Sequence, residues 1–291
     1  MDVKGQSHVV ILGCGFTGRR VANRLLSRGC RVTAATRRRS NLAELAAAGA
    51  EVIEIDPAAP HAGDALAGSL SPGCLVLHSL PSIPGGSDQT ILEGTGTAIS
   101  RVVYLSTTGV YGAAHHVNEK TPPSPRNARE SARVATENAI LQGPWESLIL
   151  RPAAIYGPGR GVHVSLRAGT FRLGLDSTNY ISRIHVEDLA GHAEAALFSG
   201  VTGAYPVADE YPCPSAEIAA FCAALLGVAV PEPTAGDEIA ETRRANRRVD
   251  GSAIRALLGI RLLYPSYREG IPACLEAEGK SPAMAQEDIR R

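Results

Sequence analysis

Three glycines near the start of the chain have the spacing of a phosphate-binding turn. An apolar run at 9–12 leads into Gly13-x-Gly15-x-x-Gly18, and a segment with helical periodicity follows at once. In this arrangement Gly13 permits the tight turn from strand to helix, and Gly15 leaves room for a pyrophosphate. Gly18 lets the helix pack closely on the strand.

The N-terminus of that helix completes the predicted phosphate site. Phe16 and Thr17 open the helix, where unpaired backbone N–H groups and the helix dipole favour an anion. Strand, turn and helix arrive in the required order, so we interpret the segment as the diphosphate site of a dinucleotide. The alternative is an ordinary tight turn between a strand and a helix.

The end of the second apolar run bears on which dinucleotide would bind. This run ends in Thr36, followed by Arg37, Arg38 and Arg39, and no acidic residue comes before Glu44. NAD(H) usually meets an aspartate or glutamate here, which binds the ribose hydroxyls. Arginines can instead bind a 2′-phosphate through charge-assisted hydrogen bonds. We therefore predict NADP(H), with NAD(H) and a solvated arginine loop as the alternatives.

Short apolar runs alternate with helical patterns through the first half of the chain. The predicted strands are 9–12, 31–36, 51–55, 74–78, 102–105 and 148–150. The predicted helices are 17–28, one capped by Ser40 that ends at Gly49, and 127–141. Strands separated by helices predict an α/β fold with a doubly wound parallel sheet covered on both faces.

The organisation changes after Pro152, where proline and glycine become dense. We predict helices at 188–198, from a cap at Ser215 to 226, and at 254–258, with a short strand at 205–208. The expected division is a dinucleotide-binding domain at 1–155, completed by about 184–200. Residues 156–183 and 201–278 would form a smaller C-terminal α/β substrate lobe, and 279–291 a frayed tail. Such a lobe would cover the carboxyl edge of the sheet, where ligands bind.

Composition excludes several classes of protein. Lysine plus arginine equals aspartate plus glutamate, at 29 each, which disfavours a nucleic-acid partner. No apolar stretch has the length of a membrane span, and the start of the chain has no room for a signal peptide. Six scattered cysteines indicate reduced thiols and a cytoplasmic protein. No cluster of histidines and acids has metal-ligand spacing, so we expect no metal site.

Three further motifs join the glycine turn in a consistent order. They are Ser-Thr-Thr-Gly-Val-Tyr-Gly at 106–112, Leu-Arg-Pro-Ala-Ala-Ile-Tyr-Gly-Pro-Gly-Arg at 150–160, and Ile-His-Val-Glu-Asp-Leu-Ala at 184–190. Together they resemble the extended short-chain dehydrogenase/reductase family, also called the NAD-dependent epimerase/dehydratase family. The resemblance covers roughly residues 7 to 275. It implies a Rossmann-type sheet, a nicotinamide cofactor and a small C-terminal substrate lobe.

The resemblance assigns roles to individual positions. It implies that Asp56 contacts the adenine amine and that Thr107 hydrogen-bonds the reacting oxygen of the substrate. After the fourth predicted strand, the segment that would line the cofactor ribose and pyrophosphate is Ser79, Leu80 and Pro81. After the sixth predicted strand, the backbone that would hold the nicotinamide amide is that of Pro152, Ala153 and Ile155.

One departure from the family bears on the mechanism. Relatives carry Tyr-x-x-x-Lys, whose tyrosine moves a proton and whose lysine binds the nicotinamide ribose. In relatives a glutamate follows the lysine by four residues, and Glu137 matches it. The tyrosine position is then Arg129 and the lysine position is Arg133. Arg133 can still donate to a ribose, but a guanidinium at position 129 cannot donate a proton at neutral pH. The pattern resembles the atypical subgroup that lacks the catalytic tyrosine. Replacements for the tyrosine are Tyr111, Tyr156, and the pair His115 and His116.

Two classes of function follow. The first is an NADP(H)-dependent oxidoreductase or epimerase/dehydratase-like enzyme, with Thr107, Arg133 and Tyr111 as its catalytic candidates. Its substrate would be a small oxygenated metabolite that is phosphorylated or is a sugar nucleotide. Arginines in the second half of the chain would bind its phosphate or carboxylate. The second is a non-catalytic NADP(H)-binding redox sensor or partner subunit, which explains the missing tyrosine. A homodimer through the helix that carries Arg133 is expected by analogy with the family.

Overall fold

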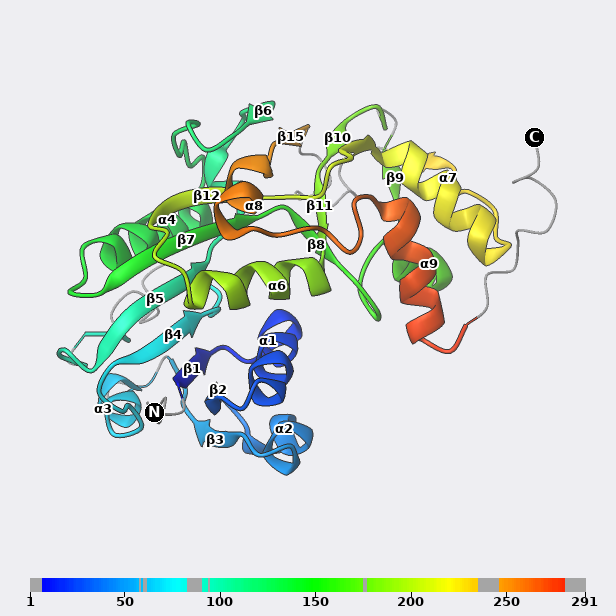
Figure 1. Ribbon diagram of the computed structural model, residues 1–291. Helices are drawn as coiled ribbons and strands as arrows, with labels where there is room; N and C mark the ends of the chain where they lie inside the picture. Colours follow the sequence, from blue (N-terminus) through cyan, green and yellow to red (C-terminus); the bar gives the residue numbers. More distant parts are fainter. Residues whose placement is uncertain are drawn as a thin grey trace.

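A seven-stranded parallel sheet forms the centre of this computed structural model (Figure 1). The structure describes residues 7–57, 59, 62–82, 91–93, 95–174, 177–234 and 246–280. The strand order is β12-β7-β5-β4-β1-β2-β3, and all six neighbouring pairs are parallel. The strands are β1 (His8–Leu12), β2 (Arg31–Thr36), β3 (Glu51–Glu54), β4 (Cys74–His78), β5 (Ile99–Leu105), β7 (Glu146–Pro152) and β12 (Gly203–Val207).

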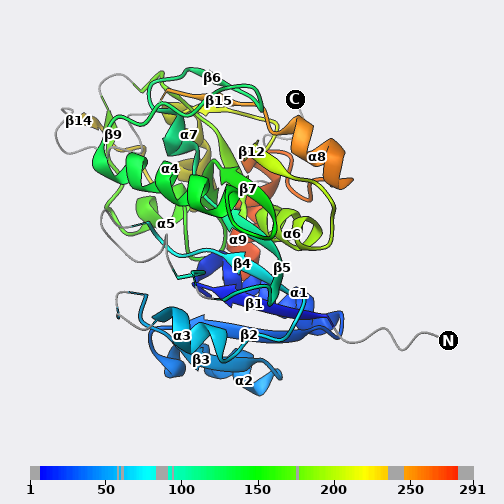
Figure 2. The same cartoon turned by 90° about the vertical axis from the view of Figure 1, so that its left-hand side faces the viewer.

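Helices cover both faces of this sheet, because alternate residues of the apolar strands point to opposite sides. Val9 and Ile11 of β1 pack with α1 (Phe16–Ser27), α2 (Ala43–Ala47), α6 (Val186–Leu197) and α8 (Ser252–Leu258). Val10 and Leu12 pack on the other side with α3 (Ala62–Ala67) and α4 (Ala128–Leu141). Figure 2 shows α4 and α6 on opposite sides of β7. The predicted doubly wound fold is confirmed.

The sheet contains the topological switch point at which this class of fold binds ligands. From β1 the chain adds β2 and β3 on one side, and then returns to add β4, β5 and β7 on the other side. The connections that follow β1 and β4 therefore leave the sheet in opposite directions and open a crevice at the carboxyl ends of the strands. The glycine turn follows β1, and the segment from Ser79 follows β4.

The predicted helices and strands recur in the structure with two local differences. Ser40 lies inside the 3₁₀ helix η1 (Arg39–Leu42) and caps nothing, because the chain takes a 3₁₀ turn before α2 begins. Ser215 is the first residue of α7 (Ser215–Leu226) and follows the N-cap Pro214, so its hydroxyl does not cap the helix. Asn127 does cap α4, since its side chain accepts a hydrogen bond from the Glu130 backbone N–H at 2.9 Å.

Residues after Pro152 also build a second hydrophobic cluster, which we call the second lobe. Three helices surround this cluster, α5 (Val162–Arg167), α7 and α9 (Tyr267–Ala277). Figure 1 shows α7 and α9 together at one end of the molecule, far from β3. The cluster consists of Tyr156, Leu166, Phe171, Leu173, Cys213, Ile218, Ala219, Cys222, Tyr267, Ile271 and Cys274.

Small strand pairs connect the second lobe to the main sheet. β8 (Ala154–Tyr156) continues from β7 and pairs with β11 (Arg183–His185), which leads directly into α6. The other pairs are β10 (Tyr180–Ile181) with β13 (Cys213–Pro214), β9 (Leu173–Gly174) with β14 (Pro233–Thr234), and β6 (His116–Val117) with β15 (Arg248–Val249).

Part of the segment expected in the substrate lobe lies with the main sheet. Gly203–Val207 forms its edge strand β12, and Ile254 and Leu262 belong to the core on the α1 side. The tail predicted to fray is 279–291, of which 281–291 lie outside the described residues. All six cysteines are free thiols. Among the described residues no helix is long and apolar enough to cross a membrane, and no cluster of three histidines, cysteines or acids could hold a metal.

Candidate functional site

The turn after β1 has the backbone geometry that its glycines predict. Gly13 has φ +80°, and a Cβ atom there would lie 2.8 Å from both the carbonyl carbon and oxygen of Ser79. A Cβ on Gly18 would lie 3.1 Å from the Gly13 oxygen and 3.2 Å from Cγ2 of Ile11. Gly13 is therefore required by the turn, and Gly18 by the contact between α1 and β1.

Gly15 differs from these two glycines because no crowding requires it. Among the described residues, a Cβ there would meet only the Gly13 oxygen, at 4.0 Å. The space beside it is open, as a diphosphate approaching the backbone requires. Gly15 is the N-cap of α1 and no side chain caps the helix, so the amides near Phe16 and Thr17 remain available to an anion.

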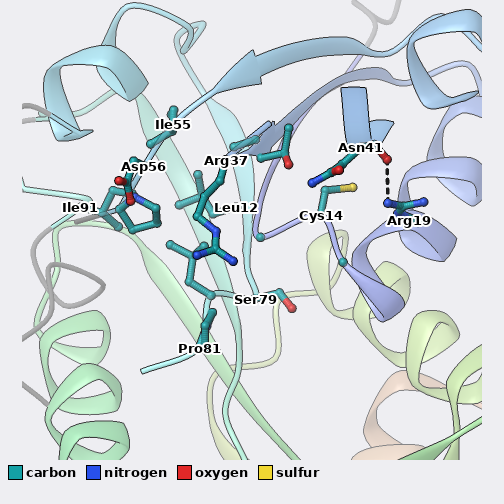
Figure 3. A pocket seen from close by; sticks show the side chains of 16 residues that line it. Leu12, Cys14, Arg19, Arg37, Asn41, Ile55, Asp56, Ser79, Pro81 and Ile91 are labelled. Atoms are coloured by element: carbon teal, nitrogen blue, oxygen red, sulfur yellow. Dashed lines mark hydrogen bonds between the residues drawn. The ribbon is translucent and has the colours of Figure 1, made fainter. Parts of the chain in front are cut away.

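A cavity of about 420 Å³ opens beside this turn, at the carboxyl ends of β1, β2 and β4 (Figure 3). It brings together eight residues that the sequence predicts for cofactor binding, namely Gly13, Gly15, Thr36, Arg37, Asp56, Ser79, Leu80 and Pro81. The other lining residues are Leu12, Cys14, Arg19, Ala35, Asn41, Ile55, Pro57 and Ile91. Apolar walls with a few polar groups are typical of a nucleotide site.

Two arginines give the β2 side of the cavity a positive charge. Arg37 is exposed at the end of β2, and Figure 3 shows its side chain extending into the cavity. Arg19 on α1 lines the cavity as well and donates to the Asn41 carbonyl oxygen at 2.6 Å. Arg38 is absent from the described lining, and its backbone N–H contacts the Thr36 hydroxyl at 3.4 Å. Arg37 and Arg19 are therefore the cations placed to meet an anionic group.

The opposite wall of the cavity presents Asp56 beside Ile55 and Ile91. A carboxylate at the rim of an apolar slot can accept hydrogen bonds from an amine such as the exocyclic group of adenine. Cys14 lies in the glycine turn, on the side of Asn41 and Arg19 (Figure 3), and burial raises the pKa of its thiol to about 12. At neutral pH this cysteine is a protonated, small apolar side chain, so the structure does not favour a redox role for it.

Arg133 lies at the carboxyl ends of β4 and β5, outside the described lining of the cavity. Its Nη1 donates to the Leu80 carbonyl oxygen at 3.1 Å, to the Tyr104 hydroxyl at 2.6 Å and to the Leu105 carbonyl oxygen at 3.4 Å. The guanidinium also lies 5.6 Å from the centre of the Tyr104 ring. These contacts hold the positive charge next to the segment Ser79–Pro81 that lines the cavity.

Thr107 follows β5 and is half-buried as the N-cap of the 3₁₀ helix η2 (Thr108–Tyr111). Its hydroxyl accepts a hydrogen bond from the Gly109 backbone N–H at 3.1 Å, which leaves the hydroxyl proton free to be donated. Arg247 holds the loop behind it, donating to the Thr108 oxygen at 2.6 Å and to the Gly112 oxygen.

Tyr111 lies in a buried polar cluster rather than at the cavity surface. It is fully buried, and its hydroxyl accepts a hydrogen bond from Nη1 of Arg151 at 3.1 Å. Arg151 in turn pairs with Glu137 at 2.6 Å, and Glu137 accepts a hydrogen bond from Ser106. Burial raises the pKa of Tyr111, which makes it a weaker acid than a free tyrosine. The cluster ties α4, β5 and β7 together.

The remaining predicted residues are distributed around the crevice. Pro152 and Ala153 are buried at the end of β7, and Ile155 is half-buried in β8. Arg129, which stands where relatives have tyrosine, is exposed on α4. Tyr156 is buried in the second lobe and donates to the Ser266 oxygen at 3.2 Å, whereas His115 and His116 are exposed.

The sequence interpretation missed Arg19, Asn41 and Ile91 as cavity residues. Arg19 lies one residue beyond the glycine motif on α1, so the helical periodicity could have placed it beside the turn. Asn41 and Ile91 come from a 3₁₀ helix and a turn, which have no periodic pattern to reveal their direction.

Comparisons with known proteins agree with this geometry. The NAD(P)H-binding family matches residues 13–193, starting at the first glycine of the turn. A 3-diazoavenalumate denitrifying reductase from Streptomyces is 29% identical over 149 residues, 46% of this chain and 49% of that protein. The chain thus spans about half the length of the curated reductase that it matches.

Solved structures extend the likeness to nearly the whole chain. A functionally unknown conserved protein from Silicibacter pomeroyi is 31% identical with a TM-score of 0.79, over 94% of this chain and 99% of that one. The UDP-glucose 4-epimerase of Thermus thermophilus, solved with NAD, has a TM-score of 0.77 at 19% identity, over 92% and 98%. The chain belongs to the NAD(P)H-binding family and has the fold of the extended short-chain dehydrogenases/reductases.

Proposed function

We propose that this protein binds NADP(H) across the carboxyl edge of its sheet and uses it to oxidise or reduce a small oxygenated metabolite. The observation that carries the proposal is the cavity at the β1 and β4 ends, where no described residue fills the space beside Gly15. In this arrangement the diphosphate lies over the glycine turn, the adenine lies at Asp56 and Ile55, and the nicotinamide half extends toward Thr107.

The charges around the end of β2 favour NADP(H) over NAD(H). Thr36 occupies the place of the acid that would bind a ribose 2′-hydroxyl, and Arg37 and Arg19 both line the cavity. A 2′-phosphate between these guanidinium groups would form charge-assisted hydrogen bonds. The same two cations give the unphosphorylated ribose of NAD(H) no comparable interaction.

Reversing the charge of Arg37 tests the choice of cofactor. We expect Arg37→Glu to raise the Kd for NADPH roughly 10-fold or more and to change the Kd for NADH by less than about threefold. Arg38→Glu is the matched control, since this neighbour is equally exposed but lies outside the described lining of the cavity. Titration calorimetry with both nucleotides measures the effect, and equal losses for NADPH and NADH would overturn the assignment.

The residues at the ends of β4 and β5 supply the rest of the proposed chemistry. A bound nicotinamide would accept or deliver the hydride. Arg133 would donate to the nicotinamide ribose from its position between Leu80 and Leu105, which its hydrogen bonds already hold. Thr107 would donate a hydrogen bond from its hydroxyl to the reacting oxygen of the substrate and polarise the carbon–oxygen bond.

An enzyme of this kind needs a proton donor, and the lack of a suitable one among the residues weighed favours a second candidate function. The hydroxyls of Tyr111 and Tyr156 are buried and hydrogen-bonded, His115 and His116 are exposed, and Arg129 has no transferable proton at neutral pH. This arrangement favours, as the second candidate, an NADP(H)-binding sensor or partner subunit without turnover. A substrate that carries its own acidic group would remove the need for a tyrosine.

A turnover assay distinguishes the two functions. Purified protein is incubated with NADPH and aldehydes or ketones, and with NADP⁺ and sugar nucleotides. The nicotinamide absorbance is followed, and the sugar nucleotides are analysed for conversion. The sugar nucleotides are included because a structural neighbour is a UDP-glucose 4-epimerase, and the carbonyl compounds because a sequence relative is a reductase. Oxidation of NADPH, reduction of NADP⁺ or conversion of a sugar nucleotide supports the enzyme, with the second lobe as its substrate-binding part. Tight binding without any of these changes supports the sensor.

A further inference from the structure

Arg160 reaches from the second lobe to the start of the phosphate-binding helix. It closes a short loop that begins at Gly157, after β8, and the two residues exchange backbone hydrogen bonds of 2.9 Å each. Gly159 inside the loop has φ +78°, a conformation that glycine adopts freely. The loop therefore has a defined shape, with Arg160 at its end.

Two contacts fix this loop against the rest of the molecule. A Cβ atom on Gly157 would lie 2.4 Å from Cγ1 of Val186 and 3.2 Å from Cζ of Phe16, so the loop backbone packs directly between α6 and α1. On the other side, the Gly159 backbone N–H donates to Oε1 of Glu278 at 2.7 Å. Arg167 donates to the same carboxylate at 2.7 Å. The loop is thus held at both ends before any ligand arrives.

The guanidinium of Arg160 lies over the Phe16 ring, 5.3 Å from its centre. Arg20 lies 4.4 Å from the centre of the same ring, but its charge is paired with Glu187 at 2.8 Å. Arg160 is exposed and has no carboxylate within ion-pair distance in the described part of the chain. Its charge therefore lies over the side chain of Phe16, the first residue of α1, which follows Gly15 in the sequence.

We propose that Arg160 binds the diphosphate of the nicotinamide dinucleotide, closing the site at the glycine turn from the side of the second lobe. The inference rests on the proposed function and adds to it a residue outside the Rossmann turn. The N-terminus of α1 favours an anion through its backbone amides, and a guanidinium at the same place adds charge-assisted hydrogen bonds. The cofactor would thereby link the main sheet to the second lobe.

The test compares nucleotides with and without a diphosphate. NADP⁺ and ADP-ribose carry the diphosphate, whereas 2′-AMP carries only the 2′-phosphate that is assigned to Arg37. We expect Arg160→Ala to weaken NADP⁺ and ADP-ribose roughly 10-fold and to leave 2′-AMP within about twofold. Arg160→Lys keeps the charge and should recover part of this loss. Arg261→Ala, at an exposed arginine of the segment after α8, is the control and should match the wild type for all three.

The outcomes separate this inference from the proposed function. If wild-type protein binds NADP⁺ and Arg160→Ala binds it equally well, or loses all three ligands equally, Arg160 does not contact the diphosphate. If wild-type protein binds none of the three, the proposed function fails and the inference falls with it. The temperature of unfolding of each variant is measured as well, to show that the variant is folded and that a loss of affinity does not come from unfolding.

Discussion

Gly13 and Gly15 are chemically identical and only two residues apart, but they serve different purposes. Gly13 has a positive φ and sits against the Ser79 backbone, so the fold needs it. Gly15 has no close neighbour among the described residues, so crowding does not require a glycine there, and a ligand would use the open space. A methyl group added at each position separates stability from binding.

We expect Gly13→Ala to lower the free energy of unfolding by about 1–3 kcal/mol, because it combines a strained φ with a contact to backbone. Gly15→Ala makes no such contact and should lower that free energy by less than Gly13→Ala does, while the Kd for NADPH rises roughly 10-fold. Urea denaturation and calorimetry measure the two quantities. A Gly15→Ala variant with unchanged affinity would show that no ligand approaches this backbone.

The positions of individual residues could be predicted from the sequence where the residue type has one physical use. Gly13, Gly18 and Arg37 lie where their chemistry predicts, because turn geometry and exposed charge depend on the local chain. The surroundings of Tyr111 depend on Arg151, which lies 40 residues away along the chain. Its burial could not be predicted from the motif around it.

Among the elements, α4 is joined to β7 by a buried ion pair. Glu137 on α4 and Arg151 on β7 are 1% and 5% exposed, and three hydrogen bonds connect them. Removing the carboxylate would leave a buried guanidinium without its counter-ion. The strand that carries Pro152 into the crevice would lose its support at the same time.

Glu137→Ala should therefore lower the free energy of unfolding by about 3–5 kcal/mol. The matched control is Glu146→Ala, which breaks the pair between Glu146 of β7 and Arg101 of β5. The Glu146 side chain is 63% exposed, and Arg101 keeps its hydrogen bonds to the carbonyl oxygens of Ala196 and Val201, so we expect a loss below about 1 kcal/mol. Chemical denaturation measures both variants. Equal losses would mean that the Glu137–Arg151 pair contributes no more than a surface pair.

The elements of the sheet were predictable because they are long and periodic. β1, β2, β4 and the helices α1 and α4 recur within a residue or two of the predicted bounds. The two-residue strands of the second lobe and helix α5 were not predicted, since segments this short contain no full period of either pattern. α9 was missed for a different reason, because Pro272 interrupts its helical pattern.

For the whole molecule, buried neutral histidines make stability sensitive to acid. His185 lies at the junction of β11 and α6, and His192 lies within α6. Burial lowers the pKa of each to about 4. The unfolded chain would take up these protons near pH 6.5, so it binds more protons than the folded protein between about pH 6.5 and 4. Stability is therefore full above pH 6.5 and is lost as the pH falls toward 4.

We expect these two rings to lower the free energy of unfolding by a few kcal/mol between pH 7 and pH 4.5. Asp209 acts in the opposite direction, because burial raises the pKa of its carboxyl to about 8. Urea denaturation at each pH measures the sum. His192→Leu should flatten this dependence, because it removes one of the two titrating rings. The ring donates to the Asp188 oxygen at 2.7 Å, so the variant also loses some stability at pH 7. A variant with the same pH slope as the wild type would show that His192 takes no part.

The division of the chain into the main sheet and the second lobe was only partly predictable from the sequence. The separate cluster around Tyr156 and Tyr267 was expected as a second lobe, but β12 returns from that part of the sequence to the edge of the main sheet. Periodicity places residues on strands and does not say which sheet a strand joins. The pairing of β12 with β7 is a tertiary choice that the local pattern does not encode.

The central claim is that a nicotinamide dinucleotide lies across the β1 and β4 ends with its diphosphate over the glycine turn. A crystal structure of the protein at saturating NADP⁺ tests this most directly. We expect nucleotide density with the diphosphate at Gly13–Gly15, the adenine at Asp56 and the 2′-phosphate at Arg37. A crevice that stays empty at saturating NADP⁺, or a nucleotide bound elsewhere, would show that the dinucleotide does not bind over the glycine turn.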